Sequence, residues 1–210
     1  MKYLGKPAGM WALFAGSFEK HLTVEFDLTA GQAKDVTARA KKKYREIIAK
    51  LPEFDKRDRF EMNIVNCAML AAFILCMPQR PDIKTLTDYY TAAMMTPTMK
   101  AFCRASGKKK FTPKDIEGMK ATAKLRAGDR NPYSWNMDFF EYEDGSGYEA
   151  RFTTCGICTL MQVLGLYDLT PALCHLDYTM SDAGGASDFV REYTLASGGP
   201  YCDCGYHKKQ

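Results

Sequence analysis

The spacing of apolar residues predicts that the first part of the chain is helical. Up to residue 127, apolar residues recur at intervals of three and four, and turn residues separate the runs. Thr29 and the pair Thr112-Pro113 fit helix starts, because a threonine side chain can accept a backbone N–H and proline is tolerated at the first helical position. We therefore predict helices over residues 9–26, 29–50, 60–76, 83–95 and 113–126.

The pattern changes after the turn-like sequence 128–132. Residues 135–143 are aromatic and partly alternating, and a glycine-containing turn leads into residues 148–153, which is typical of a hairpin. Helical spacing returns over 155–166 and 171–180, and strand-like segments follow over 189–195 and 201–207. We predict an α+β fold in which a helical lobe, residues 1–127, packs on an antiparallel sheet with two helices, residues 128–210, as one compact domain.

Composition points to a globular protein and argues against nucleic acid binding. A chain of 210 residues can bury roughly 70 % of its unfolded surface, so it needs no metal or disulfide to hold a core. The net charge of +4 is modest, and the two lysine clusters, residues 41–43 and 108–110, lack interleaved aromatic residues. We interpret both clusters as solvated surface and expect no nucleic acid partner.

The sequence also predicts a cytoplasmic location. The start of the chain has no convincing small-residue cleavage site, and the most apolar stretch, residues 64–77, is shorter than the ~20 residues of a membrane span and contains Asn66. We expect no membrane partner and reduced thiols. The pattern neither favours nor excludes a homo-oligomer.

Five of the eight cysteines gather near the end of the chain, which suggests thiol chemistry there. Cys174 and Asp177 are three apart in a predicted helix, so they share one face. A thiol there could attack while the carboxylate moves a proton, although a negative neighbour disfavours the thiolate. If the last hairpin packs on this helix, Cys202 joins them, and we predict catalytic roles for Cys174, Asp177 and Cys202.

Four other residues are candidates for substrate binding. Gly198 and Gly199 precede Cys202 and could offer amide donors to developing charge. Arg191 could pair with a substrate carboxylate or form a structural salt bridge. Asn66 lies in an apolar helix, where a buried amide needs a partner that is either a ligand or an interhelical hydrogen bond.

A metal site is the main alternative to thiol catalysis. Cys155 and Cys158 have C-x-x-C spacing, and Cys202 and Cys204 could add two sulfurs to hold zinc or iron. However, residues two apart in a strand are separated by about 6.6 Å, so C-x-C does not easily aim both thiols at one ion. The favoured prediction has no cofactor, with zinc as the alternative, and a C-x-x-C redox couple also stays open.

The C-terminal segments LTPALCHLDYTM (169–180) and REYTLASGGPYCDCGYH (191–207) resemble the signature of the L-2-amino-thiazoline-4-carboxylic acid hydrolase family, and RFTTCGICTLMQVLG (151–165) is similar to its cysteine-bearing helix. The resemblance implies hydrolytic opening of a cyclic, amidine-like C=N bond in a sulfur heterocycle, with an N-carbamoyl cysteine product. It places Cys174, Asp177 and Cys202 at the recurring polar positions and Cys155 at the upstream cysteine, here a candidate for substrate binding.

Two thiols depart from the family pattern: Cys204 stands where an aromatic residue is usual, and Cys158 is additional. The arrangement of C-x-x-D with a distant cysteine is also similar to organomercurial lyases, in which two thiols hold the metal and the acid protonates the leaving carbon. The sequence therefore supports two hypotheses, a hydrolase acting on a small cyclic amidine and a non-catalytic protein that binds a small ligand or a soft metal.

Overall fold

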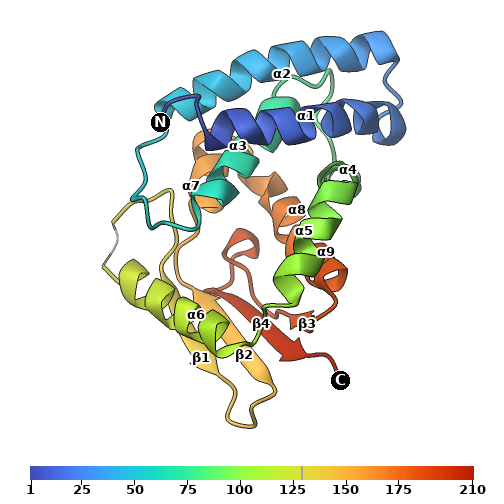
Figure 1. Ribbon diagram of the computed structural model, residues 1–210. Coiled ribbons are helices and arrows are strands. Elements are labelled where there is room, and N and C mark those ends of the chain that lie inside the picture. Colours follow the sequence, from blue (N-terminus) through green and yellow to red (C-terminus); the bar gives the residue numbers. More distant parts are fainter. Residues whose placement is uncertain (129) are drawn as a thin grey trace.

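Helices occupy one end of the molecule and a small sheet the other (Figure 1). The computed structural model describes residues 1–128 and 130–210. Helices come first in the chain, and a four-stranded antiparallel sheet with interspersed helices follows. The predicted α+β class is confirmed.

The centre of the helical end is α3 (Glu61–Ile74). It is apolar on all sides, and every residue from Cys67 to Ile74 is buried, as expected for a helix with neighbours all round. It packs against α1 (Lys6–Glu25), α2 (Ala30–Lys50) and α7 (Gly156–Val163). At the start of α2, the side chains of Thr29 and Gln32 form a capping box, which confirms the predicted helix start.

Four helices lie on the side that leads toward the sheet (Figure 1). α4 (Ile83–Met94) packs against α1 and α8 (Thr170–Cys174), and α5 (Pro97–Gly107) packs against α9 (Leu176–Gly184). The sequence analysis did not predict α5, although Thr96 caps it by accepting the Met99 N–H at 3.2 Å. The predicted helix over 171–180 is interrupted, because α8 ends at Cys174 and α9 begins at Leu176.

The sheet runs in the order β1 (Met137–Glu141), β2 (Gly147–Phe152), β4 (Cys202–Lys208), β3 (Ser187–Val190). In the pairing of β2 with β4, Phe152 lies opposite Cys202, Ala150 opposite Cys204 and Tyr148 opposite Tyr206. Residues directly opposite share a face, and residues two apart along a strand do as well. All six side chains therefore lie on one face of the sheet.

The predicted strand over 189–195 is wrong beyond Val190. The Asp203 carboxylate accepts the backbone N–H groups of Glu192 at 2.9 Å and Tyr193 at 2.6 Å. These amides pair with a side chain instead of a strand, so the chain leaves the sheet and forms the short 3₁₀ helix η2 (Leu195–Ser197). A second short turn, η1 (Tyr167–Leu169), leads into α8.

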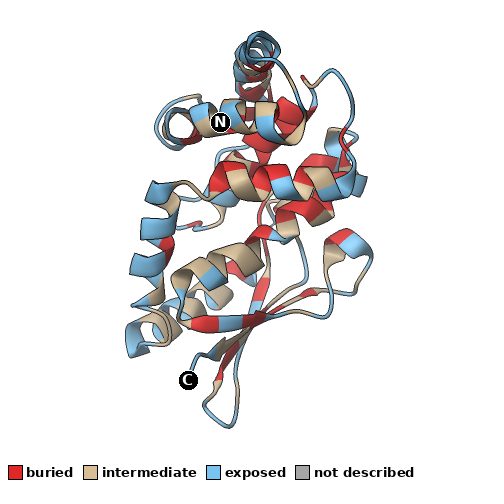
Figure 2. Cartoon of the chain, turned by 90° about the vertical axis from the view of Figure 1, so that its right-hand side faces the viewer, coloured by how far each residue is buried: buried red, intermediate tan, exposed pale blue. Residues whose placement is uncertain are grey.

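Helix α6 (Pro113–Arg126) covers the sheet, where Met119 and Ala123 pack against a small core that includes Met137 and Ala150. Buried residues concentrate between the helices and along the strands, and the outer helix faces are exposed (Figure 2). The main core combines residues from both sides of position 127, including Phe73 and Leu160. The division of the chain at that position stays a prediction.

A buried ion pair connects α6 to the segments before α3 and β1. Arg126 lies 3.1 Å from the Asp58 carboxylate and donates to the Trp135 carbonyl at 2.9 Å, and the Ser134 hydroxyl donates to Asp58 at 2.6 Å. Both charged side chains are almost fully buried. Within residues 1–128 and 130–210, no helix combines the length and the hydropathy that a membrane span requires.

Candidate active site

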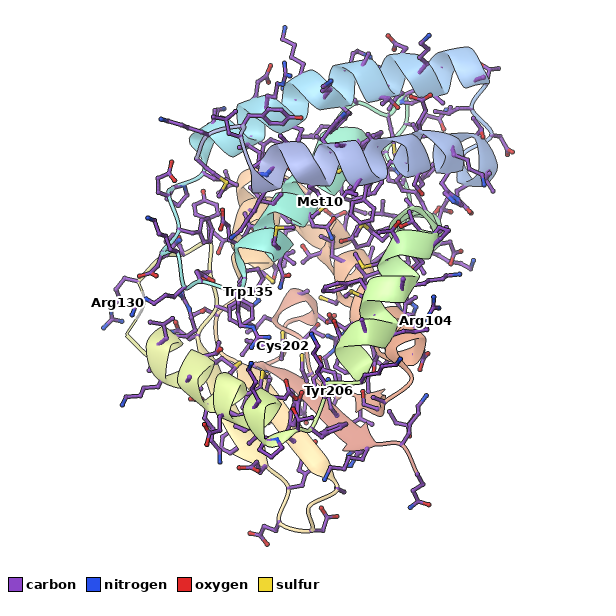
Figure 3. The ribbon with its side chains drawn as sticks, viewed as in Figure 1. Met10, Arg104, Arg130, Trp135, Cys202 and Tyr206 are labelled. Carbon is purple, nitrogen blue, oxygen red and sulfur yellow. The ribbon has the colours of Figure 1, made fainter. Side chains whose placement is uncertain are left out.

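The sheet face that carries Cys202, Cys204 and Tyr206 looks toward the helices (Figure 3). Cys174, at the end of α8, and Asp177, in the first turn of α9, lie above it. The charge of Asp177 acts on the thiols of Cys174, Cys202 and Cys204. The structure therefore brings the three predicted catalytic residues, Cys174, Asp177 and Cys202, to the same side of the sheet.

Arg191 connects these elements from the end of β3. One guanidinium nitrogen lies 2.8 Å from an Asp177 carboxylate oxygen and 4.0 Å from the Cys204 sulfur. The other donates to the Cys174 carbonyl at 2.7 Å, a carbonyl that the end of α8 leaves without a helical partner. The guanidinium also lies 5.1 Å from the ring centre of Phe189 and 5.2 Å from that of Tyr178. Of the two interpretations of Arg191, the structure contains the salt bridge.

Asp177 combines exposure to solvent with an environment that disfavours its charge. Its side chain is 46 % exposed, but burial within the surrounding protein raises its pKa above the ordinary value, and Arg191 opposes this rise. A carboxylate on the outer surface would keep its hydration shell. Asp177 therefore stays partly accessible to solvent within an environment that disfavours its charge.

Cys202 has a hydrogen-bond donor directed at its sulfur. The backbone N–H of Leu195 donates to Sγ at 3.2 Å. Burial raises the pKa of this thiol, and the amide opposes the rise because it stabilises the thiolate. Loop 192–199 thus approaches Cys202 through its backbone.

The two glycines shape this loop. Gly198 adopts a φ of 80°, which favours glycine, and a side chain on Gly199 would lie 2.9 Å from the Thr194 carbonyl. The Gly198 and Gly199 amides donate to the Leu195 and Thr194 carbonyls at 3.2 and 2.8 Å. Because these donors are used within the turn, the glycines position the backbone of Leu195, and a role of their amides in substrate binding stays a prediction.

Cys174 borders an open hollow of about 240 Å³ on the outer side of the cluster. Burial raises the pKa of its thiol to about 12, with Asp177 adding to the rise and Arg191 opposing it. The thiol is therefore protonated near neutral pH. The hollow gives solvent a route to Cys174, and its wall also includes Arg191, His175, Tyr178, Thr194 and Ser197.

Cys155 lies at the start of α7 and belongs to the same group of sulfurs. Its pKa is well above the ordinary value, first because its thiol hydrogen-bonds Cys158 and second because it is buried. It lies close enough to Cys174 and Cys202 that a Cys155 thiolate would raise the pKa of both thiols. All eight cysteines, which lie within the described residues, are free thiols.

Asn66 approaches the cluster from α3. Its side chain hydrogen-bonds the hydroxyl of Tyr90 on α4, and the pKa of Tyr90 is raised by burial and also by the charge of Asp177. The Asn66 Oδ1 atom is buried without a hydrogen-bond partner in the described part of the chain. The predicted interhelical bond therefore accounts for the amide nitrogen only.

The alternative metal site does not form as one group. Among the described residues, no three histidine, cysteine, aspartate or glutamate side chains are placed to hold one ion. Cys202 and Cys204 share the face of β4, and Cys155 and Cys158 pair with each other at α7.

Two further residues at this face were not predicted. Lys110, from the connection between α5 and α6, places its Nζ atom 3.3 Å from the ring centre of Tyr206. The interpretation of residues 108–110 as solvated surface is therefore wrong for Lys110, which is partly buried, whereas Lys108 and Lys109 are exposed. The two-residue period of β4 could have placed Tyr206 beside Cys204, but no sequence signal separates Lys110 from its two neighbours.

We compared the sequence with models of known protein families. Residues 57–206, more than half of the chain, match the family described as L-2-amino-thiazoline-4-carboxylic acid hydrolase. The chain belongs to this family. The matched region of this L-2-amino-thiazoline-4-carboxylic acid hydrolase family member contains Cys174, Asp177, Arg191 and Cys202, and it begins after α2. Searches of curated proteins and of solved structures found no match.

Proposed function

We propose that this protein opens the ring of 2-aminothiazoline-4-carboxylate or a close cyclic amidine, with Cys202 as nucleophile and Asp177 as proton carrier. Family membership supports the class of substrate. One observation carries the assignment of roles: the Arg191 guanidinium contacts the Asp177 carboxylate at 2.8 Å and the Cys174 carbonyl at 2.7 Å. These two contacts hold Asp177 and Cys174 against the sheet that carries Cys202.

Cys202 is the better nucleophile of the two predicted thiols. The Leu195 amide donates to its sulfur and stabilises the thiolate, whereas the pKa of Cys174 is raised to about 12. Asp177 removes the Cys202 proton as the sulfur attacks the ring carbon of the C=N bond, and it delivers that proton to the ring nitrogen. Cys174 stays protonated and offers a weak S–H donor to the ring sulfur.

The remaining steps consume one water molecule. The bond from the attacked carbon to the ring sulfur breaks, and that sulfur takes a proton from the exocyclic nitrogen, leaving the opened substrate joined to Cys202 as an S-substituted isothiourea. Water then adds to the same carbon, the bond to Cys202 breaks and the thiol recovers its proton. The product carries a carbamoyl group on nitrogen and a free thiol.

Asn66 fits the amidine end of such a substrate. Its Oδ1 atom is a buried acceptor without a partner in the described residues, and an amidine carries N–H donors. A hydrogen bond between them would satisfy the acceptor and orient the C=N bond. We therefore propose that Asn66 binds the exocyclic nitrogen, with Cys155 beside the cluster as part of the wall.

Three single variants test the proposal. Cys202→Ser and Asp177→Asn should lower kcat by at least about 100-fold, because each removes a group that bonds to or moves a proton of the substrate. Cys174→Ser should lower it less. Ring opening is measured by release of the new thiol with a chromogenic disulfide after the protein's own thiols have been subtracted.

Cys76→Ala is the matched control. Cys76 is a buried thiol just beyond α3, where Arg39 and Lys43 act on it, and none of Cys174, Asp177 or Cys202 does. Its removal should leave kcat within about twofold of the parent, since the cavity affects stability rather than the site. Equal rates in the parent, Cys202→Ser and Asp177→Asn would contradict the proposed function.

A further inference from the structure

Lys110 is held in an aromatic environment at the sheet. Its Nζ atom lies 3.3 Å from the ring centre of Tyr206, 5.2 Å from that of Tyr148 and 5.7 Å from that of Phe111. A cation over an aromatic face gains electrostatic attraction from the ring. The side chain is thus directed onto the helix-facing side of the sheet instead of into solvent.

No carboxylate of the described residues forms an ion pair with this cation. The Lys110 Nζ atom takes part in cation–π contacts, and in the described part of the chain it forms no ion pair or hydrogen bond. The nearby Asp115 carboxylate acts on Lys110 through its charge without an ion-pair contact, and one of its oxygens accepts the Phe111 N–H at 2.9 Å and the Tyr148 hydroxyl at 3.4 Å. Burial lowers the pKa of Lys110 to about 8, and Asp115 opposes this change. A partly buried cation without an anion is an arrangement that a bound anion would stabilise.

The backbone next to Lys110 is fixed in an unusual conformation. Phe111 has a φ of 62°, a value that is uncommon for an aromatic residue and costs conformational energy. The bond from the Phe111 N–H to Asp115 holds this conformation at the start of α6. The chain thereby directs Lys110 inward while Lys108 and Lys109 stay exposed.

Lys110 and the proposed nucleophile lie on the same face of the sheet. Cys202, Cys204 and Tyr206 follow one another at every second position of β4 on this face, and Lys110 lies over the ring of Tyr206. Asp177 and Cys204 both act on Tyr206. Cys202 and Tyr206 are four residues apart, or about 13 Å along the strand. A small ring with a carboxylate, in contact with the Cys202 sulfur at one end and hydrogen-bonded to Lys110 at the other, would bridge this separation.

Arg191 is not free to serve as the anion site, because its guanidinium already binds Asp177 and the Cys174 carbonyl. We infer that Lys110, held over Tyr206, binds the carboxylate of the substrate and so selects cyclic amidines that carry an acidic group on the ring. This inference rests on the proposed function for the identity of the substrate. The anion subsite itself can be tested by binding alone.

The binding test uses thiazolidine-4-carboxylate, a saturated analogue without a C=N bond, titrated by calorimetry into the full-length protein. Lys110→Met and Lys110→Gln should weaken binding by about 10- to 100-fold, the range expected when a charge-assisted hydrogen bond is lost. Lys110→Arg should retain most of the affinity. Lys109→Met is the matched control and should bind like the parent, because Lys109 is exposed.

Turnover then separates this inference from the proposed function. With 2-aminothiazoline-4-carboxylate, Lys110→Met should raise KM about 10- to 100-fold and change kcat little, and with 2-aminothiazoline, which lacks the carboxylate, it should match the parent. If the parent opens neither ring but Lys110→Met loses affinity for the analogue, the proposed function fails and the anion subsite stands. Equal affinity for the analogue in the parent, Lys110→Met and Lys110→Gln would overturn the inference.

Discussion

Arg191 and Asp177 show how two opposing effects set the ionisation of one carboxylate. Burial raises the pKa of Asp177, and the guanidinium 2.8 Å away lowers it, with burial the larger effect. The proposed mechanism begins with an ionised Asp177, because the carboxylate must accept the Cys202 proton. Activity should therefore fall as the pH drops through a pKa that lies above the ordinary range of an aspartate.

Removal of Arg191 should raise the pH below which activity falls. In Arg191→Met the carboxylate loses its positive neighbour but stays surrounded by protein, so its pKa rises further and the acid limb of the kcat/KM profile moves to higher pH. Arg191→Lys keeps a positive charge and should shift the limb less. The profile of kcat/KM against pH for the three proteins measures the effect.

Arg151→Met is the control for this series. Arg151 lies opposite Asp203 on the other face of the sheet, where it pairs with Glu149 at 2.7 Å. Its removal should leave the acid limb in place. An acid limb that stays unchanged in Arg191→Met, or moves to lower pH, would show that Asp177 is not the group that titrates.

Part of the site could be predicted at the level of residues. The resemblance of the C-terminal segments correctly indicated the family. Cys174 and Asp177 lie close enough for the Asp177 charge to act on the Cys174 thiol, although the predicted helix is interrupted between them. The Leu195 amide on Cys202 could not be predicted, because it depends on how the loop 192–199 folds around Asp203. Lys110 could not either, since a lysine cluster usually lies in solvent and the positive φ of Phe111 leaves no mark in the sequence.

Among the elements, the close crossing of α5 and α9 positions the acid. A β-carbon on Gly107 would lie 2.2 Å from the carbonyl oxygen of Gly184, so the two helices approach backbone to backbone. α9 carries Asp177 near its start, and α5 leads directly into the segment of Lys110. The crossing therefore joins the helix that carries Asp177 to the helix that leads to Lys110, and both residues belong to the proposed site.

Gly107→Ala should disturb both the crossing and the activity. The new methyl group forces the helices apart, which should lower the free energy of unfolding by about 1–3 kcal/mol and should reduce turnover through displacement of Asp177. Urea unfolding and steady-state kinetics measure the two effects.

Gly118→Ala in α6 provides the comparison, because a β-carbon there meets no atom within 4 Å. This substitution should stabilise the protein by up to about 1 kcal/mol, the difference in helix propensity, and should leave turnover unchanged. Equal stabilities of Gly107→Ala and Gly118→Ala would contradict the role assigned to the crossing.

The sequence signals predicted which helices and strands are present more reliably than where each of them begins and ends. Five helices and the central hairpin are formed near their predicted positions because apolar spacing and caps act locally. The strand predicted over 189–195 is too long, because the Asp203 side chain accepts the backbone N–H groups that would have extended the strand pairing. Helix α5 was missed although Thr96-Pro97 carries the same start signal as Thr112-Pro113.

Across the whole molecule, the site depends on segments that are distant in sequence. Asn66 comes from α3, Lys110 from the connection between α5 and α6, Cys174 and Asp177 from α8 and α9, and Cys202 from β4. The buried pair of Asp58 and Arg126 fixes α6 against the segment before α3, with the Trp135 carbonyl as a third contact. Composition and periodicity predicted the α+β class, but which helices cover the sheet follows from such long-range contacts.

The central claim is that Cys202 forms a covalent bond to the opened substrate. The most direct test mixes the parent protein with 2-aminothiazoline-4-carboxylate, stops the reaction with acid within the first turnover and maps the peptides by mass spectrometry. We predict that the peptide containing Cys202 gains the full mass of one substrate molecule, that fragmentation places this mass on Cys202, and that Cys76 is unmodified. Ring opening without any adduct on Cys202 would contradict the account.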